Sequence, residues 1–464
     1  MKHTFLALPT ALMLGSFALA ACGGATATPT AVPAAPAATT APAATAAPAP
    51  AATEAPAATA APATEAAAIQ LWFHSGQGGE RDALNATLDA FKAANPDINV
   101  DAVQLPEGSY NDQVNAAALA NDLPCLLDFD GPNLYNYAWS GYLTPLDSYV
   151  SAEMKADFLP SIVSQGTYNG KLYSLGQFDS GLGFYANKDY LEAASVRIPT
   201  VAQPWTLDEL NAALAALKAV AGVEYPLDLK MNYGRGEWFT YGFSPFLQSF
   251  GGDLINRTDY STAEGVINGP EAVEALTWFQ GVFTSGYSIA KPAGDTDFVD
   301  GKTALSWVGH WTYPDYSKAL GDKLLVLPAP DLGSGARTGM GSWNWGITEG
   351  CADKDAAWKL LEFILSTDEV VRMSKASGAV PARTSAIDKV ELFADGGSLN
   401  IYVQQLNNGV AFPRPITPAY PAITIAFAEA VDNIVNGADV KAELDKAAKA
   451  IDQNIEDNQG YPVQ

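Results

Sequence analysis

Hydrophobic and polar positions alternate along the chain with two different periods, and their order predicts strands and helices in turn. Residues 69–74 (IQLWFH) form a short apolar run typical of a buried strand, and residues 98–105 (INVDAVQL) form another. Between them, residues 79–95 carry Leu84, Leu88 and Phe91 at the spacing of one helix face. This β-α-β beginning predicts an open α/β sheet with right-handed crossovers.

The same alternation continues to the end of the chain. Further strands are predicted at CLLDFD (125–130), KLYSLGQ (171–177), GLGFYAN (181–187), TALSWVG (303–309), KLLVLPA (323–329) and SWNWGIT (342–348). Helices are predicted at 207–220, 270–283, 354–366 and 440–455. Because the alternating region is longer than one ordinary domain, we expect two α/β lobes.

The N-terminal segment predicts an exported protein. Lys2 and His3 precede an apolar run that is too short to span a bilayer and ends in small residues, which indicates a signal peptide at 1–21. The LAAC sequence at 19–22 resembles the bacterial lipobox, and this implies cleavage before Cys22 and lipidation of that cysteine. Residues 25–68 are nearly all Ala, Pro and Thr, so 22–68 is expected to form an extended tether with threonines available for glycans. The protein would then be anchored by lipid to the outer face of the bacterial cytoplasmic membrane.

Charge and cysteine content narrow the possible partners. The 464 residues carry a net charge of −25 without a basic cluster, which argues against nucleic acid as a partner. Besides Cys22 the chain has Cys125 and Cys351. Outside the cytoplasm these two can form a disulfide, and two buried free thiols are the alternative.

Catalytic and cofactor motifs are missing from the sequence. Outside the signal peptide the only histidines are His74 and His310, and there is no CxxC, HExxH, GxSxG or P-loop. We therefore expect no cofactor, no metal and no enzymatic activity. Asp128 and Asp130 lie on one face of a predicted strand, so an exported glycoside hydrolase with paired carboxylates stays as an alternative.

Aromatic residues are abundant: the chain has 10 Trp, 19 Tyr and 19 Phe. A sugar presents flat C–H faces that pack on aromatic rings and hydroxyls that need directional partners. Aromatic side chains with Asp, Asn, Glu and Arg at their edges satisfy both needs, so the composition favours sugar binding.

An ordered series of segments resembles the extracellular solute-binding proteins of ABC sugar importers, the maltose-binding-like group. The resemblance runs from residue 69 to the C-terminus. It rests on INVDAVQLPEGSYNDQV, NLYNYAWSGYLTPLDSYV, YNGKLYSLGQFDSGLGFYANKDYLEAA, PWTLDELNAAL, FVDGKTALSWVGHW, AAWKLLEFILS, SGAVPAR and AFPRPITPAYP.

This resemblance implies a periplasmic-binding-protein fold with ligand in a cleft between two α/β lobes. The first lobe would comprise 69–178 and 343–385, and the second 182–338 and 390–464. Crossings would fall at 178–181, 339–342 and 386–389, and the first two of these contain small residues that can absorb rotation. The resemblance also implies a monomer that binds a sugar, expected to be an oligosaccharide, and delivers it to the transmembrane subunits of an ABC permease. A polyol, a glycerol phosphoester or another small solute is the alternative ligand.

Candidate ligand-binding residues follow from strand ends and from the resemblance. His74 and Asp130 end predicted strands, where open α/β sheets bind ligands, although either could instead cap a loop or a helix. Asp179 and Ser180 lie beside the first crossing, where one of them is expected to contact the ligand.

In GRGEWFTYGF (234–243) the resemblance makes Glu237 a hydroxyl acceptor and Trp238 a stacking ring; the start of an amphipathic helix is the alternative. It makes Trp311 in VGHWTYP another stacking tryptophan. In PRPITPAY, Arg414 and Tyr420 are further candidates, and Arg414 could instead tie a loop to a helix C-terminus.

The stretch GMGSWNWG (339–346) places two tryptophans one residue apart. The resemblance puts Trp343 near the cleft floor, with Ser342 and Asn344 as polar neighbours, and Trp345 in the core. Four other tryptophans lie in or beside predicted helices and are expected to be structural: Trp139, Trp205, Trp278 and Trp358.

Overall fold

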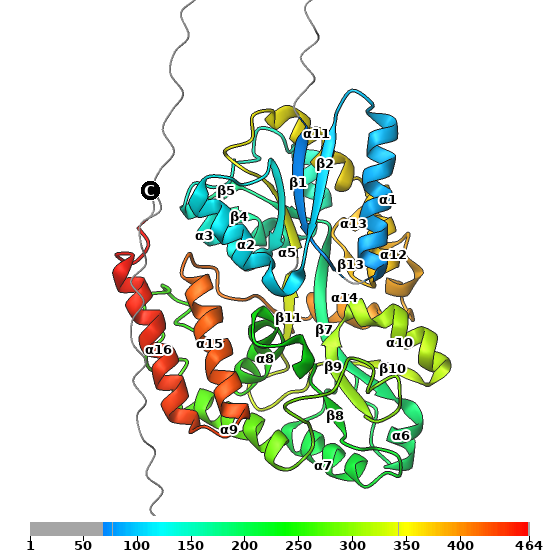
Figure 1. Ribbon diagram of the computed structural model, residues 1–464. Helices are drawn as coiled ribbons and strands as arrows, with labels where there is room; N and C mark the ends of the chain where they lie inside the picture. The colour runs from blue at the N-terminus through cyan, green and yellow to red at the C-terminus, as the bar shows by residue number, and fades with distance from the viewer. Residues whose placement is uncertain (1–67, 77, 342, 463–464) are drawn as a thin grey trace, which may run out of the picture. The chain divides into compact units, whose positions relative to one another are not determined.

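Two mixed β-sheets with flanking helices organise the residues that the computed structural model of the chain describes, namely 68–76, 78–341 and 343–462 (Figure 1). These residues belong to one compact unit, Thr64–Gln464. The predicted signal peptide, lipidated Cys22 and tether lie outside the described residues. None of the described helices is long and apolar enough to cross a membrane.

The first sheet has the strand order β2-β1-β3-β12-β6. Its strands are β1 (Ile69–His74), β2 (Val100–Leu105), β3 (Leu126–Asp130), β6 (Leu175–Gly176) and β12 (Trp343–Ile347). β1 runs parallel to β2 and β3, whereas β12 is antiparallel to β3 and opposes Trp343 to Asp130. The β-α-β beginning is therefore confirmed, and a strand from much later in the chain completes the sheet.

The helices around the first sheet come from two stretches of the chain. They are α1 (Gly78–Ala94), α2 (Glu107–Ala120), α3 (Leu134–Trp139), α4 (Ala152–Asp157), α5 (Pro160–Gln165), α11 (Lys354–Ile364), α12 (Thr367–Ser377) and α13 (Thr384–Ile387). A small hairpin of β4 (Thr167–Tyr168) and β5 (Lys171–Leu172) lies in the same part. Leu84, Leu88 and Phe91 of α1 are all buried in the core against this sheet, as their spacing predicts.

The second sheet is built around the long strand β7 (Phe178–Asn187) and has the order β14-β11-β7-β9-β8. The other strands are β8 (Leu227–Asp228), β9 (Leu305–Gly309), β10 (Leu324–Leu327), β11 (Thr338–Gly341), β13 (Val380–Pro381) and β14 (Ala411–Phe412). β10 and β13 pair with β7 off the main path. The glycines of β7 allow a close approach, because a Cβ at Gly181 would lie 2.7 Å from the ring of Tyr402.

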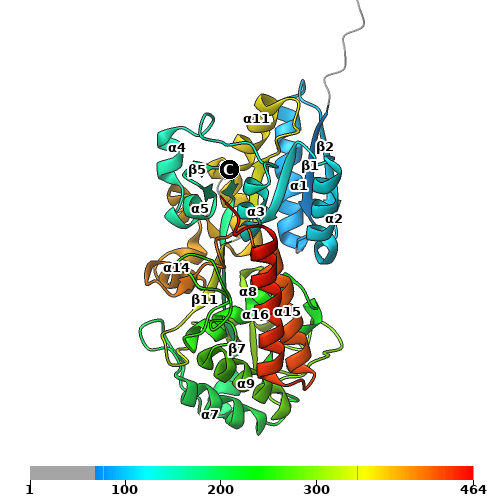
Figure 2. The same ribbon diagram turned by 90° about the vertical axis from the view of Figure 1, so that its left-hand side faces the viewer.

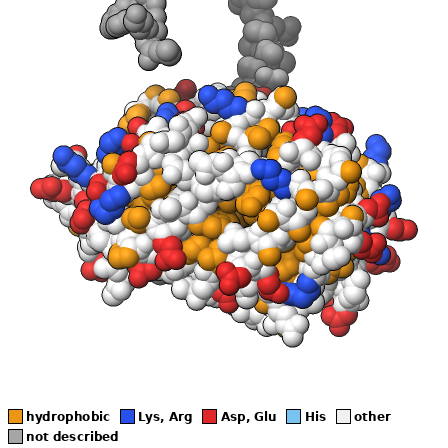
Figure 3. All heavy atoms as spheres, turned by 90° about the horizontal axis from the view of Figure 1, so that it is seen from below, with side chains coloured by type: hydrophobic (Ala, Val, Ile, Leu, Met, Phe, Trp, Pro, Cys, Tyr) orange, Lys and Arg blue, Asp and Glu red, His pale blue; other side chains and the backbone are white. Residues whose placement is uncertain are grey.

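The second sheet carries its own set of helices. They are α6 (Lys188–Ala193), α7 (Leu207–Lys218), α8 (Glu237–Ser249), α9 (Pro270–Thr284), α10 (Tyr313–Leu320), α14 (Asn400–Asn407), α15 (Tyr420–Val435) and α16 (Val440–Asp457). α15 and α16 lie side by side (Figure 2), and α8 packs against α15 and α9. Figure 3 shows the molecule from below, with hydrophobic side chains gathered in the middle of this face and many charged side chains towards its rim.

The chain passes between the two sheets at the places that position the site. β6 belongs to the first sheet and is followed directly by β7, while β11 of the second sheet precedes β12 of the first. A disulfide bond also links the chain beside two neighbouring strands of the first sheet, because Cys125 directly precedes β3 and its partner Cys351 follows β12. Of the two states that the sequence leaves open for these cysteines, the structure has the bonded one.

Candidate functional site

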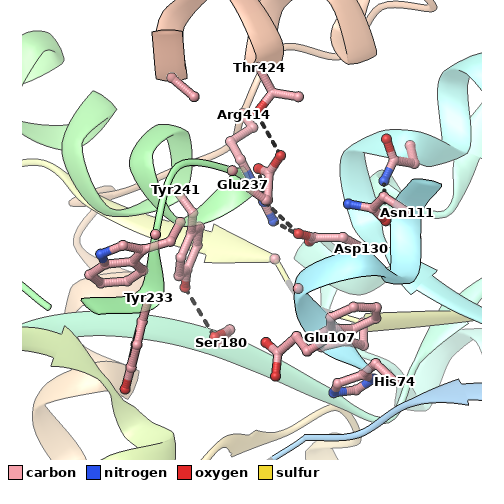
Figure 4. Close-up of a pocket in the computed structure, with 18 of the residues that line it drawn as sticks. His74, Glu107, Asn111, Asp130, Ser180, Tyr233, Glu237, Tyr241, Arg414 and Thr424 are labelled. Carbon is pink, nitrogen blue, oxygen red and sulfur yellow. Dashed lines mark hydrogen bonds and ion pairs between the residues drawn. The ribbon is translucent and has the colours of Figure 1, made fainter. Parts of the chain in front are cut away.

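A cavity of about 560 Å³ lies where residues from both sheets and their connections meet (Figure 4). This volume is within the roughly 300–1,000 Å³ typical of small-molecule sites. His74, Asp130 and Trp343 line it from the ends of β1, β3 and β12. The opposite lining comes from α8, from the turn after β9 and from the loop after β14.

Four aromatic side chains from the region of the second sheet form one side of the cavity, which we call the aromatic wall: Tyr233, Trp238, Tyr241 and Trp311. The rings of Trp238 and Trp311 meet edge to face, with centroids 6.0 Å apart. The Trp311 Nε1–H donates a hydrogen bond to the Tyr233 hydroxyl at 3.2 Å, and the Trp238 Nε1–H donates to the Leu229 carbonyl at 3.2 Å. These bonds fix the ring orientations before any ligand arrives.

Trp343 provides an aromatic surface from the first sheet, and His74 supports it from behind. The two rings stack with centroids 3.5 Å apart and an interplanar angle of 6°. His74 Nδ1 lies 2.6 Å from Asp128 Oδ2, and Nε2 lies 3.4 Å from Glu80 Oε1. Burial lowers the pKa of His74, but the two carboxylates outweigh this effect and raise the pKa well above its usual value. The imidazolium thus braces the indole through a stacked cation–π contact.

A buried ion-pair network joins the two parts of the chain across the cavity. Arg414 donates from Nη2 to Asp130 Oδ1 at 2.7 Å and from Nη1 to Oδ2 at 3.0 Å, and it also pairs with Glu237. Tyr420 donates its hydroxyl proton to Glu237, and Thr424 donates to the other oxygen at 2.7 Å. Asp130 ends β3, whereas Glu237 begins α8, so the arginine connects the two sheets.

Electrostatics make this network sensitive to the loss of any member. Burial raises the pKa of Glu237, although the charge of Arg414 opposes that effect. Burial alone lowers the pKa of Arg414, but Asp130, Tyr420 and Glu237 raise it well above its usual value. The guanidinium also lies 4.7 Å from the ring centroid of Tyr241. Its charge is therefore already engaged on three sides.

A chain of hydrogen bonds passes through β7 at the base of the cavity. Tyr241 donates to Ser180 Oγ at 3.0 Å, Ser180 Oγ lies 3.0 Å from His310 Nε2, and His310 Nδ1 lies 2.8 Å from the Ser377 carbonyl. A carbonyl only accepts, so Nδ1 carries the proton, and burial lowers the pKa of His310 so that the ring is neutral. Nε2 then accepts from the Ser180 hydroxyl, which links α8, β7 and α12.

Most of the residues expected to contact ligand do line the cavity. They are His74, Asp130, Ser180, Glu237, Trp238, Trp311, Trp343 and Arg414. The structure nevertheless gives two of them an additional role that the patterns do not indicate. His74 is held by carboxylates under Trp343, and Arg414 is held by Asp130 and Glu237.

Three candidates lie behind the lining, and a fourth falls outside the described residues. Asp179 alternates with Ser180 along β7, so it faces away, and its Oδ1 accepts from the Gly341 N–H at 2.9 Å. Asn344 alternates with Trp343 in the same way and donates to Ser174 Oγ at 3.0 Å. Tyr420 is fully buried and reaches Glu237 from behind. Ser342 is not among the described residues.

The expected structural tryptophans are placed as predicted. Trp345 is 4 % exposed in the core of the first sheet, and Trp205 is 1 % exposed in that of the second. Trp139, Trp278 and Trp358 do not line the cavity either.

Several lining residues were missed by sequence reasoning. Glu107 begins α2 immediately after β2, at the same sheet edge as His74, and Asn111 follows one helical turn later, so strand-end reasoning could have included them. Tyr241 lies one helical turn after Glu237, which is a usable signal once that helix is recognised. Tyr233 gives no comparable pattern. Within the described ranges, no group of three or more His, Cys, Asp or Glu side chains is placed to hold a metal ion.

Comparisons with known proteins agree on one kind of molecule. A family model described as bacterial extracellular solute-binding protein matches residues 86–397. The maltotriose-binding protein of Pyrococcus abyssi is 22% identical over 405 residues, which are 84% of this chain and 82% of that protein. The solved structure of the cyclic alpha-maltosyl-1,6-maltose binding protein of Arthrobacter globiformis is 26% identical with a TM-score of 0.67, covering 84% of this chain and 99% of that one. The GacH receptor of Streptomyces glaucescens, solved unliganded and with acarbose, is 24% identical with a TM-score of 0.73, covering 84% and 98%.

Proposed function

Because the chain belongs to the family of bacterial extracellular solute-binding proteins, we propose that it binds an oligosaccharide in this cavity and delivers it to an ABC permease. The two-lobed α/β fold, shared with solved receptors of this kind, supports the proposal. The protein acts outside the cytoplasm and catalyses no reaction on the sugar.

The observation that carries this proposal is the pairing of aromatic surfaces from the two sheets in one cavity. Trp343 comes from the first sheet, and the aromatic wall comes from the second. Carboxylates, hydroxyls and amides lie between and beside these rings, among them Glu107, Asn111 and Ser180. Flat apolar surfaces bordered by hydrogen-bonding groups fit the C–H faces and the hydroxyl belt of a sugar.

The charge of the lining favours a neutral ligand over an anionic one. Six carboxylic acids line the cavity: Glu80, Glu107, Asp112, Asp130, Glu237 and Glu429. The cationic side chains in the lining are His74, Arg235 and Arg414. Two of these three already pair with carboxylates, so little positive charge is left for a phosphoester or a uronic acid. A neutral sugar fits better than a glycerol phosphoester.

Ligand capture would work by closing the two lobes around the sugar. We assign 69–178 and 343–385 to the first lobe and 182–338 and 390–464 to the second, with rotation at 178–181, 339–342 and 386–389. A sugar that touches both lobes stabilises the closed state through its differential affinity for the two states. The permease would then recognise surfaces of both lobes. Asp179, Asn344 and Tyr420 serve in this scheme as support around the crossings and the ion-pair network. Ser342, which lies outside the described residues, stays a predicted polar neighbour of the ligand beside Trp343.

Placement at the membrane follows from the N-terminal segment. We propose that Cys22 is lipidated and that residues 22–68 tether a monomeric receptor to the outer face of the bacterial cytoplasmic membrane. The lipobox-like LAAC sequence and the Ala-, Pro- and Thr-rich composition support this placement.

A thermal-shift screen of the purified protein against mono- and oligosaccharides tests the proposal. A neutral glycan should raise the melting temperature in proportion to the logarithm of its concentration above Kd, without release of reducing ends. Trp311→Ala should abolish that shift, whereas Trp139→Ala, which lies outside the cavity, should keep it. Turnover of any glycoside, or an unchanged shift in Trp311→Ala, would overturn the proposal.

A further inference from the structure

The cavity continues past the Arg414–Asp130 pair into a groove between two helices of different lobes. α2 lines this outer groove with Asn111, Asp112 and Asn115, and α15 lines it with Thr424, Ile425 and Glu429. In Figure 4, Thr424 and Asn111 lie on helices at opposite sides, beyond the ion pair as seen from Ser180 and His74. The groove and the inner site belong to one continuous cavity.

Space in the groove is provided by a missing side chain on α2. Gly108, Asn111 and Asn115 follow one another at helical spacing, so they share one face of the helix. A Cβ added to Gly108 would meet no atom within 4 Å. The helix surface is therefore hollow at the end nearest the inner site and carries amides further along.

The chemistry of the outer groove repeats that of the inner site with an aliphatic surface in place of a ring. Ile425 is 67 % exposed and lines the cavity, so it offers an apolar surface to whatever enters the groove. Asn111 and Asn115 supply amide donors and acceptors, and Asp112 and Glu429 supply further acceptors. No Lys or Arg is present among these six side chains, so the groove disfavours an anion.

We propose that the outer groove binds further neutral sugar units of the same chain whose end occupies the inner site. The inference rests on the proposed function and makes the ligand a linear oligosaccharide rather than a mono- or disaccharide. One end of the chain packs between Trp343 and the aromatic wall. The chain then passes the Arg414–Asp130 pair, and its outer units lie over Ile425 with their hydroxyls on the two asparagines.

Isothermal titration calorimetry with two glycan ladders tests the inference. Glucose and the α-1,4 series from maltose to maltopentaose form the first ladder, and the β-1,4 series from cellobiose to cellopentaose forms the second. For the linkage that binds, affinity should rise with chain length beyond the disaccharide. Tri-galacturonate, an anionic trimer, should bind far more weakly than the neutral trisaccharide of the ladder that binds.

Two variants place the effect in the groove. Ile425→Asn removes the apolar surface, and Gly108→Gln fills the hollow with a residue that favours helix more than glycine does. Each should weaken the binding of the longest glycan by at least about 10-fold while leaving the shortest bound glycan unchanged. Ile198→Asn is the matched control, because Ile198 is 46 % exposed but does not line the cavity.

The outcomes separate this inference from the proposed function. Length-dependent affinity that both groove variants remove would support it. Affinity that stops rising at the disaccharide, or groove variants that bind every length like the wild type, would overturn this inference alone. If the wild type bound no glycan of either ladder, the proposed function and this inference would both be overturned.

Discussion

Removing the Arg414 side-chain charge is the most informative single perturbation of the site. In Arg414→Met, Asp130 and Glu237 would remain at the same place without their shared cation. The side chains of Asp130 and Glu237 are only 13 % and 15 % exposed, and that of Arg414 is 5 % exposed, so water would screen the two unpaired carboxylates little. Removing one partner of such a buried pair costs about 3–5 kcal/mol. That loss is a large share of the roughly 5–15 kcal/mol typical of a folded domain.

The cost should depend on pH in a definite direction. Burial already raises the pKa of Glu237 in the wild type, and loss of the arginine raises it further. A carboxyl whose folded pKa is raised favours folding when it is protonated, and this contribution is lost as the pH rises through the folded pKa. The destabilisation of Arg414→Met should therefore be larger at pH 7.5 than at pH 5.

Urea unfolding at both pH values, followed by tryptophan fluorescence, measures this effect. Lys323→Met serves as the control, because Lys323 and Asp189 form an exposed pair with side chains 60 % and 52 % exposed. Exposed pairs contribute only about 0–1 kcal/mol. A loss below about 1 kcal/mol at pH 7.5 in Arg414→Met, or a loss that does not shrink at pH 5, would show that the arginine does not neutralise two buried carboxylates.

Three further predictions concern the framework of the site. Replacing both Cys125 and Cys351 by serine should lower the free energy of unfolding by about 2–5 kcal/mol, and dithiothreitol should reproduce that loss in the wild type; an unchanged urea midpoint would contradict this. His74 has a raised folded pKa, so the stability from its charge is complete below about pH 6.5 and is lost as the pH rises through the folded value. Melting temperatures of His74→Gln between pH 6 and 9 should fall less than those of the wild type, and parallel curves would argue against a charged His74. Gly181→Ala should cost about 1–3 kcal/mol because its Cβ would lie 2.7 Å from the Tyr402 ring, and wild-type stability in calorimetry would show that the ring moves freely.

The sequence predicts the elements of the fold well where one period dominates. The strand and helix at the beginning, β1 and α1, match their apolar patterns closely, as do α7, α9, α11 and α16. α2 was missed because its apolar positions are few: Tyr110, Val114 and Ala118 are its buried residues among many small and polar ones. The predicted strand at 171–177 divides into the short β5 and β6, which pair with different partners: β5 with β4, and β6 with β12 of the first sheet.

Strand ends and the family resemblance together predict part of the site from the sequence. Alternation places Trp343 and Trp345 on the same side of β12, so only the family resemblance predicted that Trp343 lines the cavity and Trp345 lies in the core. Alternation also places Asn344 on the opposite side from Trp343, a consequence that sequence reasoning did not draw. The Arg414–Asp130 pair is 284 positions apart in sequence, so no local pattern reveals it. The pairing depends on the register of β12 beside β3 and on the loop after β14, which are properties of the assembled fold.

Diffraction from crystals grown with the tightest-binding glycan would show whether a sugar binds between the two sheets. We expect electron density for a sugar inside the cavity, with ring carbons about 3.5–4.0 Å from Trp343 and from the aromatic wall. Hydroxyls should lie within hydrogen-bond distance of groups from both sheets. A sugar bound at another surface, or one that contacts residues of only one sheet, would show that the cavity between the two sheets is not the binding site.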